Sequence, residues 1–374
     1  YYVYDARTQT FRTFEASSRG TIPPRMQFGV SYRARPVLSG GQYPNEIVYG
    51  AQGSVTDWDA APARARADQA VIVGQGRARV FPDIVRGMRA HNDDVLFVWC
   101  DGSVWRQMGD PMLGGEYHQV MKGIGLASTW AHCFGPDGAL YFLATDGHVY
   151  RMAMDGSREK ISDQVRARFL DIDHVRYAVE LHWDIAFDGV WMVLIPKAEP
   201  VADALHYFWC KRMAAWHPVQ FGGGSARCVT AVGMRDGDRP DDRATLFAFA
   251  DGTVAATHRF ATDDAGVPIR HQTIIGQLVP SRQPTDTKLG QVGIALAHGS
   301  SPVTVGAFAS TVPDVLGEIR GARVARAGRG LRIPVRARGS SLFLGVGGVG
   351  RMALEELHAQ VGRGGQKQRS QRRT

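Results

Sequence analysis

The chain has 374 residues, of which 44% are hydrophobic and 21% charged, and this globular balance excludes wholesale disorder. The net charge of +8 comes from 44 basic and 36 acidic residues, an excess too diffuse to indicate a nucleic-acid-binding protein by itself. The 44 glycines and 18 prolines follow no collagen-like period, so they predict many tight turns.

The N-terminal segment, YYVYDARTQTF, lacks the basic region and apolar core of a signal peptide. It opens within a strand-like run and without Met, so we expect the start of translation to lie upstream. No run of 18 apolar residues occurs in the chain, so no membrane span is predicted. The four cysteines contain no CxxC pair and are expected to be unpaired structural thiols.

An aromatic hairpin is predicted over residues 1–14, and the same layout of aromatic strand, polar turn and aromatic strand returns at residues 205–221. We expect most of these aromatic side chains to pack in a core. Short helices are expected at most at residues 63–69, 162–171 and 352–361.

A strand–turn–strand unit recurs along the chain. Its strands begin at residues 47, 96, 141, 190 and 246, with a similar run, LFLGVGGVG, at residue 342. Asp-Gly between apolar runs predicts a hairpin whose type I′ turn has positive φ at both central residues. A period of about 45 to 55 residues is typical of a β-propeller blade built from four short strands. The sequence therefore predicts an all-β protein, a β-propeller that carries an inserted small β-rich domain.

The domain organisation follows from where this period breaks. Residues 263–339 contain strand-like pieces without the Asp-Gly signature. We predict propeller blades over 1–262, an inserted β-rich domain over 263–339, the last blade strands over 340–357, and a basic tail over 358–374. An independent C-terminal domain is the alternative to the insertion. Closure of the propeller would pair the first strands with the last, because unpaired edges invite aggregation.

Motifs that carry chemistry are scarce. The chain has no P-loop, GxSxG, HExxH or EF-hand loop, so no catalytic residue, cofactor or metal site is predicted. Two groups contain metal-ligating residue types, His206 with Cys210 and His217, and Asp171 with Asp173 and His174. An aromatic core hairpin explains the first group and a solvated loop the second. Catalytic carboxylates of propeller glycosidases would come from distant blades and leave no local sign, so that alternative stays open.

Arginine is concentrated near the C-terminus. Seven arginines and a single acid, Glu318, stand between residues 318 and 338, and the tail is basic as well. The segment has no aromatic residue to stack bases, which disfavours base-reading recognition of single strands. A solvated loop, an acidic neighbouring subunit and a DNA backbone remain three interpretations. The candidate subunit or DNA contacts are Arg320, Arg323, Arg326, Arg329, Arg332, Arg336, Arg338, Lys367, Arg369, Arg372 and Arg373.

Within residues 92–156, a strand ending in Trp-Arg is followed by a Gly-Asp-Pro and then by a hairpin reading DGALYFLATDGHVYR. In this order the segment resembles the tail and head-to-tail connector proteins of tailed bacteriophages, including nozzle (tail tubular) proteins. The resemblance continues in HWDIAFDGVWMVLIP, in AAWHPVQF and in RIPVRARGSSLFLGV. It covers most of the chain in style and order, and no motif in it is diagnostic alone.

The resemblance implies a structural virion protein of the tail or neck, made in the host cytoplasm, with no catalytic residues. Its expected partners are further copies of itself in a ring, commonly a hexamer, other tail proteins such as the adaptor or portal and tail fibres, and the double-stranded genome in the lumen. The alternative is a β-propeller glycan-binding protein or glycoside hydrolase with a site at the channel mouth.

A conduit must let DNA slide, so we expect most of the arginines between 320 and 338 to face an acidic subunit surface. At most one or two per chain would then face the lumen. Subunit contacts are expected at the insertion and around residues 57–66, with a total interface on the order of 2,000 Å².

Overall fold

The computed structural model describes residues 2–5, 7–15, 19–74, 81–91, 93–198, 205–221, 228–235, 243–257, 263–264, 267–278, 287–311, 316–326, 328–334, 337–350, 352 and 354–363. Within them the chain is all-β, apart from the short helix α1 (Arg166–Leu170) and two 3₁₀ turns, η1 (Pro111–Leu113) and η2 (Asp163–Val165). Two compact units are distinguished, unit 1 over Tyr1–Gln220 and Ser225–Thr257, and unit 2 over Phe221–Gly224 and His258–Thr374.

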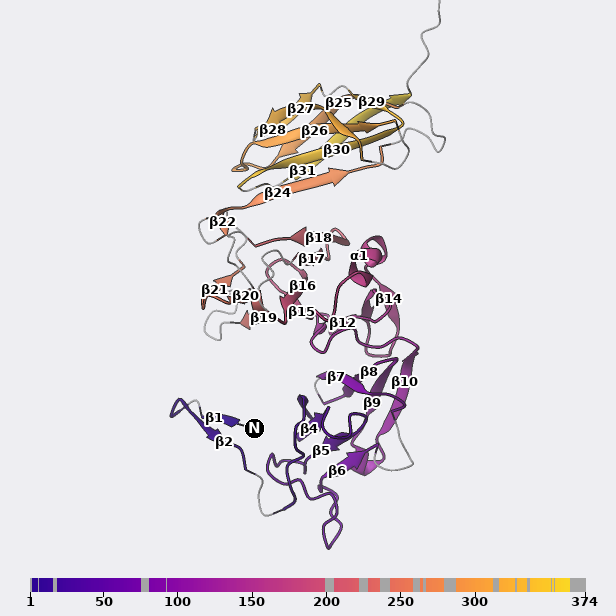
Figure 1. The fold of residues 1–374 in the computed structure, drawn as a ribbon, viewed down its shortest axis with the longest axis vertical. Helices are drawn as coiled ribbons and strands as arrows, with labels where there is room; N and C mark the ends of the chain where they lie inside the picture. Colours follow the sequence, from indigo (N-terminus) through magenta and orange to yellow (C-terminus); the bar gives the residue numbers. More distant parts are fainter. Residues whose placement is uncertain are drawn as a thin grey trace, which may run out of the picture. The chain divides into compact units, whose positions relative to one another are not determined.

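Besides a two-stranded hairpin at residues 2–13, the described part of unit 1 contains five antiparallel sheets in chain order, each made of consecutive strands (Figure 1). The first sheet has β3 (Phe28–Tyr32), β4 (Arg35–Ser39), β5 (Ile47–Tyr49) and β6 (Val71–Val73). The second has β7 (Val85–His91), β8 (Val95–Cys100), β9 (Ser103–Met108) and β10 (Glu116–Lys122). The third has β11 (His132–Phe134), β12 (Leu140–Leu143), β13 (Val149–Met152) and β14 (Arg158–Lys160). The fourth has β15 (Tyr177–Asp184), β16 (Gly189–Pro196), β17 (His206–Cys210) and β18 (Ala215–Val219). The fifth has β19 (Cys228–Arg235), β20 (Arg243–Phe249) and β21 (Val254–Ala256).

The second strands of the second, third and fourth sheets, β8, β12 and β16, are buried on both faces, and this packs successive sheets together. Side chains alternate along a strand, so Leu96, Val98 and Cys100 of β8 join the core shared with the first sheet. Phe97 and Trp99 point the other way, into the core that continues through the third and fourth sheets.

Aromatic contacts carry this packing along unit 1. The ring of Phe142 on β12 lies 5.8 Å from that of Trp99, while its neighbour Tyr141 lies 5.1 Å from Trp183 in the fourth sheet. Trp191 on β16 meets Phe247 of the fifth sheet at 5.2 Å. Large flat side chains thus join each sheet to the next.

The predicted hairpins fall in separate sheets, with two differences from expectation. The second strands of the last four sheets begin at 95, 140, 189 and 243, close to the predicted starts. The run at Ile47 is instead the third strand of its sheet, and β4 holds the second position. The run at Leu342 contains no hairpin turn, and residues 342–349 of it lie within one continuous strand.

The Asp-Gly turns have a geometry other than type I′. At Asp146-Gly147 and Asp251-Gly252 only the glycine has a positive φ, of 78° and 87°. The carboxylate Oδ1 of Asp146 accepts the N–H of residue 148 at 3.1 Å, and that of Asp251 accepts the N–H of residue 253 at 2.9 Å. The same side-chain bond recurs in the turns at residues 137–139 and 155–157. Aspartate therefore serves these turns by imitating a backbone carbonyl.

The aromatic hairpins at 1–14 and 205–221 both form. In the second, β17 and β18 complete the fourth sheet and bury Trp209 and Trp216. In the first, β1 (Tyr2–Asp5) pairs with β2 (Thr10–Thr13) in a sheet of their own. Its side chains are exposed, at 76% for Tyr2 and 73% for Phe11, so they do not pack in a core of the described chain as expected.

Unit 2 is a sandwich of two antiparallel sheets, drawn in orange and yellow in Figure 1. One sheet has the order β24 (Arg270–Ile275), β30 (Ser341–Val349), β26 (Val303–Ser310) and β27 (Glu318–Ala325). In the other, β25 (Thr287–Leu296) pairs with β28 (Gly328–Ile333), β29 (Ala337–Gly339) and β31 (Leu354–Arg363). Alternate residues of β25, β26 and β30 form its core. Short strands β22 (Asp263–Asp264) and β23 (Val267–Pro268) also pair.

The pairing of residues 340–357 differs from the one we expected. We placed them in the last propeller blade, but β30 pairs with β24 and β26, and β31 pairs with β25. Leu342, Leu344 and Val346 of β30 lie in the core of unit 2, so burial holds this segment there. The helix expected at 352–361 is likewise wrong, since β31 occupies this stretch. The glycines of β30 admit neighbours instead of forming a turn: a Cβ on Gly345 would lie 2.6 Å from the Phe308 ring.

Candidate functional site

A cavity of about 630 Å³ lies where the first strands of four successive sheets of unit 1 meet. Its lining side chains come from β7, from β11 and its flanks, from β15, and from β19, with Ala244 of β20. β11 and β15 are joined here, because residue 130 forms a parallel bridge with residue 180 and the Trp130 carbonyl accepts the Leu181 N–H at 3.1 Å. Volumes of this size are typical of small-ligand sites.

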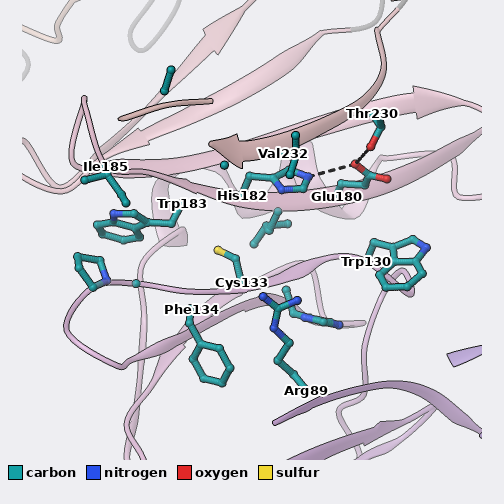
Figure 2. Close-up of a pocket in the computed structure, with 16 residues that line it drawn as sticks. Arg89, Trp130, Cys133, Phe134, Glu180, His182, Trp183, Ile185, Thr230 and Val232 are labelled. Atoms are coloured by element: carbon teal, nitrogen blue, oxygen red, sulfur yellow. Dashed lines mark hydrogen bonds and ion pairs between the residues drawn. The ribbon is translucent and has the colours of Figure 1, made fainter. Parts of the chain in front are cut away.

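Glu180 on β15 is the acidic residue among those that line the cavity, and its carboxylate is already engaged (Figure 2). Its Oε2 lies 3.1 Å from His182 Nε2 and accepts the hydroxyl of Thr230 at 3.0 Å. The N–H of Ala231 donates to the same oxygen at 3.3 Å. Glu180 therefore ties the fourth sheet to the fifth, and its charge is met by donors of the protein.

His132 on β11 is buried against Trp99, whose ring lies 4.6 Å away and nearly parallel. Burial, together with the nearby Arg89 charge, lowers the pKa of His132 to about 3. The imidazole is therefore neutral at physiological pH. Among the described residues its Nδ1 has no hydrogen-bond partner.

Arg89 on β7 supplies the positive charge at the cavity. Its guanidinium carbon lies 5.9 Å from the centre of the Phe134 ring, and the side chain is exposed. Within the described part of the chain, no carboxylate pairs with it. In Figure 2 Arg89 extends toward Cys133, with Trp183 on one side of the view and Trp130 on the other.

The two tryptophans differ in burial. Trp130 is 51% exposed and presents an open aromatic surface. Trp183 is 8% exposed, and its Nε1 has no hydrogen-bond partner among the described residues. The cavity therefore combines the open aromatic surface of Trp130 with the exposed guanidinium of Arg89.

A second carboxylate near this region has a structural role. Asp184, at the end of β15, is fully buried, and its Oδ2 accepts bonds from Trp191 Nε1 at 3.0 Å and Thr245 Oγ1 at 2.9 Å. Thr257 donates to the same oxygen at 3.1 Å. Asp184 does not line the cavity, so Glu180 is the one carboxylate among the described residues that line it, whereas most glycosidases use two.

The candidate arginines lie on edge strands of unit 2. Arg320 and Arg323 are on β27, Arg326 follows it, Arg329 and Arg332 are on β28, and Arg338 is on β29. The side chains of Arg320, Arg323, Arg326, Arg332 and Arg338 are exposed. Arg320 Nη2 lies 3.4 Å from Glu318 Oε2, an exposed pair. Arg336 and the tail residues Lys367, Arg369, Arg372 and Arg373 lie outside the described residues. Charged side chains on edge strands discourage unwanted strand pairing, which gives these arginines one role in any assembly.

The metal-ligating residue types that the sequence groups together have other roles. Nδ1 of His206 accepts the N–H of Leu194 at 3.1 Å inside the fourth sheet. Oδ1 of Asp173 accepts the N–H of Val175 at 2.9 Å in a turn. Across the described ranges, no three His, Cys, Asp or Glu side chains are placed to share a metal ion. No helix among them is long and apolar enough to cross a bilayer.

Sequence reasoning missed the cavity. One signal was present, the polar residues Glu180 and His182 that alternate with apolar ones in YAVELHWD. Such alternation marks the accessible face of a strand whose other face is buried. What the sequence did not reveal is that this face meets β7, β11 and β19.

Known proteins offer only distant likenesses. No family model matches the chain, and no curated protein matches it. Among solved structures, the extracellular domain of BT4673 from B. thetaiotaomicron is 9% identical over 69% of this chain, with a TM-score of 0.34. This chain spans only 37% of that one.

Two further structures align at similar scores. An exo-beta-1,3-galactanase from Phanerochaete chrysosporium is 8% identical, with 93% of this chain and 98% of that chain covered and a TM-score of 0.32. YCF48 bound to D1 peptide is 11% identical, with 63% and 79% covered and a TM-score of 0.29. TM-scores this low carry no conclusion about function. The class that the fold defines is an all-β protein with several four-stranded antiparallel sheets.

Proposed function

We propose that this chain is a structural virion protein of a tailed bacteriophage, which assembles as a ring around the DNA exit channel and anchors other tail proteins. In this proposal the five sheets of unit 1 are β-propeller blades. The chain-order succession of consecutive-strand sheets, packed face to face, supports the propeller. The phage assignment rests on the sequence resemblance of residues 92–156 and the later segments.

The exposed hairpin β1–β2 is the observation that supports assembly most directly. A two-stranded hairpin alone is marginally stable in water, and this one exposes Tyr2, Tyr4 and Phe11. The rings of Tyr4 and Phe11 lie 5.0 Å apart and form an apolar patch. Aromatic side chains of this kind are enriched at protein interfaces. A second copy of the chain, or another tail protein, would supply the missing cover.

The edge strand β27 supports the same proposal. It exposes Ile319 and Val324 beside Arg320 and Arg323. Apolar residues flanked by arginines are typical of interface surfaces, and an acidic subunit face would complement them. The loop expected at residues 57–66 is partly engaged within the chain, since Asp57 pairs with Arg66 at 2.7 Å.

Native mass spectrometry of the full chain tests this proposal. We expect a closed oligomer, six copies of the 40.9 kDa chain in the hexameric case. A triple variant with Tyr2→Ser, Tyr4→Ser and Phe11→Ser should remain folded and lose the oligomer. Tyr43→Ser is the matched control, because Tyr43 is an exposed aromatic residue outside the hairpin. A triple variant that forms the same oligomer as the parent would refute the role of the hairpin.

A second candidate, a glycan-binding propeller, is favoured by the cavity at the first strands. Aromatic residues beside the exposed Arg89 and Thr230 there suit a polar ring-shaped ligand. Because a single carboxylate, Glu180, lines it in the described chain, we propose binding and not hydrolysis.

A further inference from the structure

We propose that the cavity of unit 1 binds a sugar acid, a six-membered hydroxylated ring that bears one carboxylate, with Arg89 pairing the carboxylate. The inference deepens the second candidate function, and it stands or falls separately from ring assembly.

The charge of the ligand follows from the charges that line the cavity. Arg89 is the arginine and Glu180 the carboxylate among the described residues that line the cavity. Glu180 is satisfied by its three donors, whereas the described chain supplies no carboxylate for Arg89. His132 is neutral and adds no second positive charge. One unpaired guanidinium calls for one anionic group, and its fork matches a carboxylate bidentately.

The polar character of the ligand follows from the polar side chains that line the cavity beside Arg89. Thr230 is exposed, and Glu180 and His182 are half-buried. Ring hydroxyls both accept and donate, so they can bond to a hydroxyl, a carboxylate and an imidazole alike.

The shape of the ligand follows from the aromatic surface. Trp130 is half exposed at the cavity, and Phe134 lies beneath the Arg89 guanidinium. The C–H face of a sugar ring can pack on such a flat apolar surface while its hydroxyls stay at the polar edge. A simple carboxylate such as acetate would leave this surface uncovered. A ring with hydroxyls and one carboxylate matches the charge of Arg89, the polar side chains and the aromatic surface of Trp130.

Isothermal titration calorimetry with glucuronate and galacturonate tests the inference on the full chain, with glucose and acetate as comparison ligands. We expect at least one uronate to bind, and glucose and acetate to bind at least tenfold more weakly. Arg89→Gln should weaken uronate binding at least tenfold, and Trp130→Ala several-fold.

Arg176→Gln is the matched control, because its guanidinium carbon also lies 5.9 Å from an aromatic ring, that of Tyr177, but outside the cavity. It should leave uronate binding unchanged. An unchanged urea midpoint would show that each variant is folded. The inference is overturned if neither uronate binds at a concentration of about 10 mM, which is on the order of the weakest dissociation constants of specific sites. It is also overturned if glucose or acetate binds as tightly as the uronate, or if Arg89→Gln binds it as the parent does.

Discussion

Arg35 on β4 holds two sheets and a loop together, and we expect its removal to be among the most destabilising single changes in unit 1. It is 1% exposed, and its Nε donates to Asp110 Oδ2 at 2.7 Å. The remaining donors reach the backbone carbonyls of Gly50, Asp68, Gln69 and Ala67 at 3.0, 3.1, 2.7 and 3.4 Å. Arg35→Met retains the volume of the side chain and removes every one of these bonds.

The expected loss follows from what Arg35→Met leaves behind. Asp110 is buried, and among the described residues its carboxylate would retain the bond from the Met112 N–H at 2.8 Å. Removing one partner of a buried ion pair typically costs about 3–5 kcal/mol, because the other charge stays desolvated. Arg35→Lys retains the charge but loses the fork that reaches the carbonyls, so we expect a smaller loss of about 1–2 kcal/mol.

Urea unfolding followed by tryptophan fluorescence measures this effect in unit 1 alone, since all eight tryptophans belong to residues 58–216. The double variant Arg35→Met with Asp110→Asn should be more stable than the sum of the two single losses predicts, because no charge is then left unpaired. A loss below about 1 kcal/mol for Arg35→Met, or additive single losses, would refute this reasoning.

Three further predictions concern other parts of the chain. Burial lowers the pKa of His206 to about 4. Because an unfolded histidine titrates near 6.5, the free energy of unfolding should fall by about 1.4 kcal/mol per pH unit as the pH drops from 6.5 to 4. Urea midpoints measured at several pH values should show this pH dependence in the parent and not in His206→Gln. A Cβ at Gly189 would lie 2.1 Å from the Trp209 carbonyl oxygen, so Gly189→Ala should cost about 1–3 kcal/mol or more in urea unfolding, whereas Gly233→Ala, with its nearest atom at 3.7 Å, should cost little. Seven arginines on DNA phosphates would give a log–log salt slope of about −6, and if most of them face a subunit instead, the slope in filter binding should be shallower than about −2.

The repeat of strand–turn–strand units could be predicted from the sequence because turn chemistry is local. Asp146-Gly147 and Asp251-Gly252 form turns through bonds within three residues, so composition alone marks them. Their exact backbone type was missed, since aspartate can imitate a carbonyl as readily as it can adopt a positive φ. The glycines of β30 were misread for a different reason. Gly345 admits the Phe308 ring from a neighbouring strand, a contact that no local pattern encodes.

The cavity illustrates the same limit. Each of its first strands is unremarkable by itself, and Arg89, His132 and Glu180 are separated by more than forty residues. Their meeting depends on how successive sheets pack, which is set by contacts such as Trp99 with Phe142. Pattern reasoning identifies the aromatic residues that make those contacts, but not the space that they leave between the first strands.

Strand β8 contributes Leu96 and Val98 to one core and Phe97 and Trp99 to another. This two-sided burial affects how the chain folds during synthesis on the ribosome. A nascent chain emerges N-terminus first at about 5–20 residues per second, so each newly formed sheet waits with one apolar face uncovered until the next sheet follows. Fragments cut between sheets, for example after residue 122, would keep such a face permanently and should aggregate. Fragments cut near residue 257, where unit 1 ends, should be far more soluble.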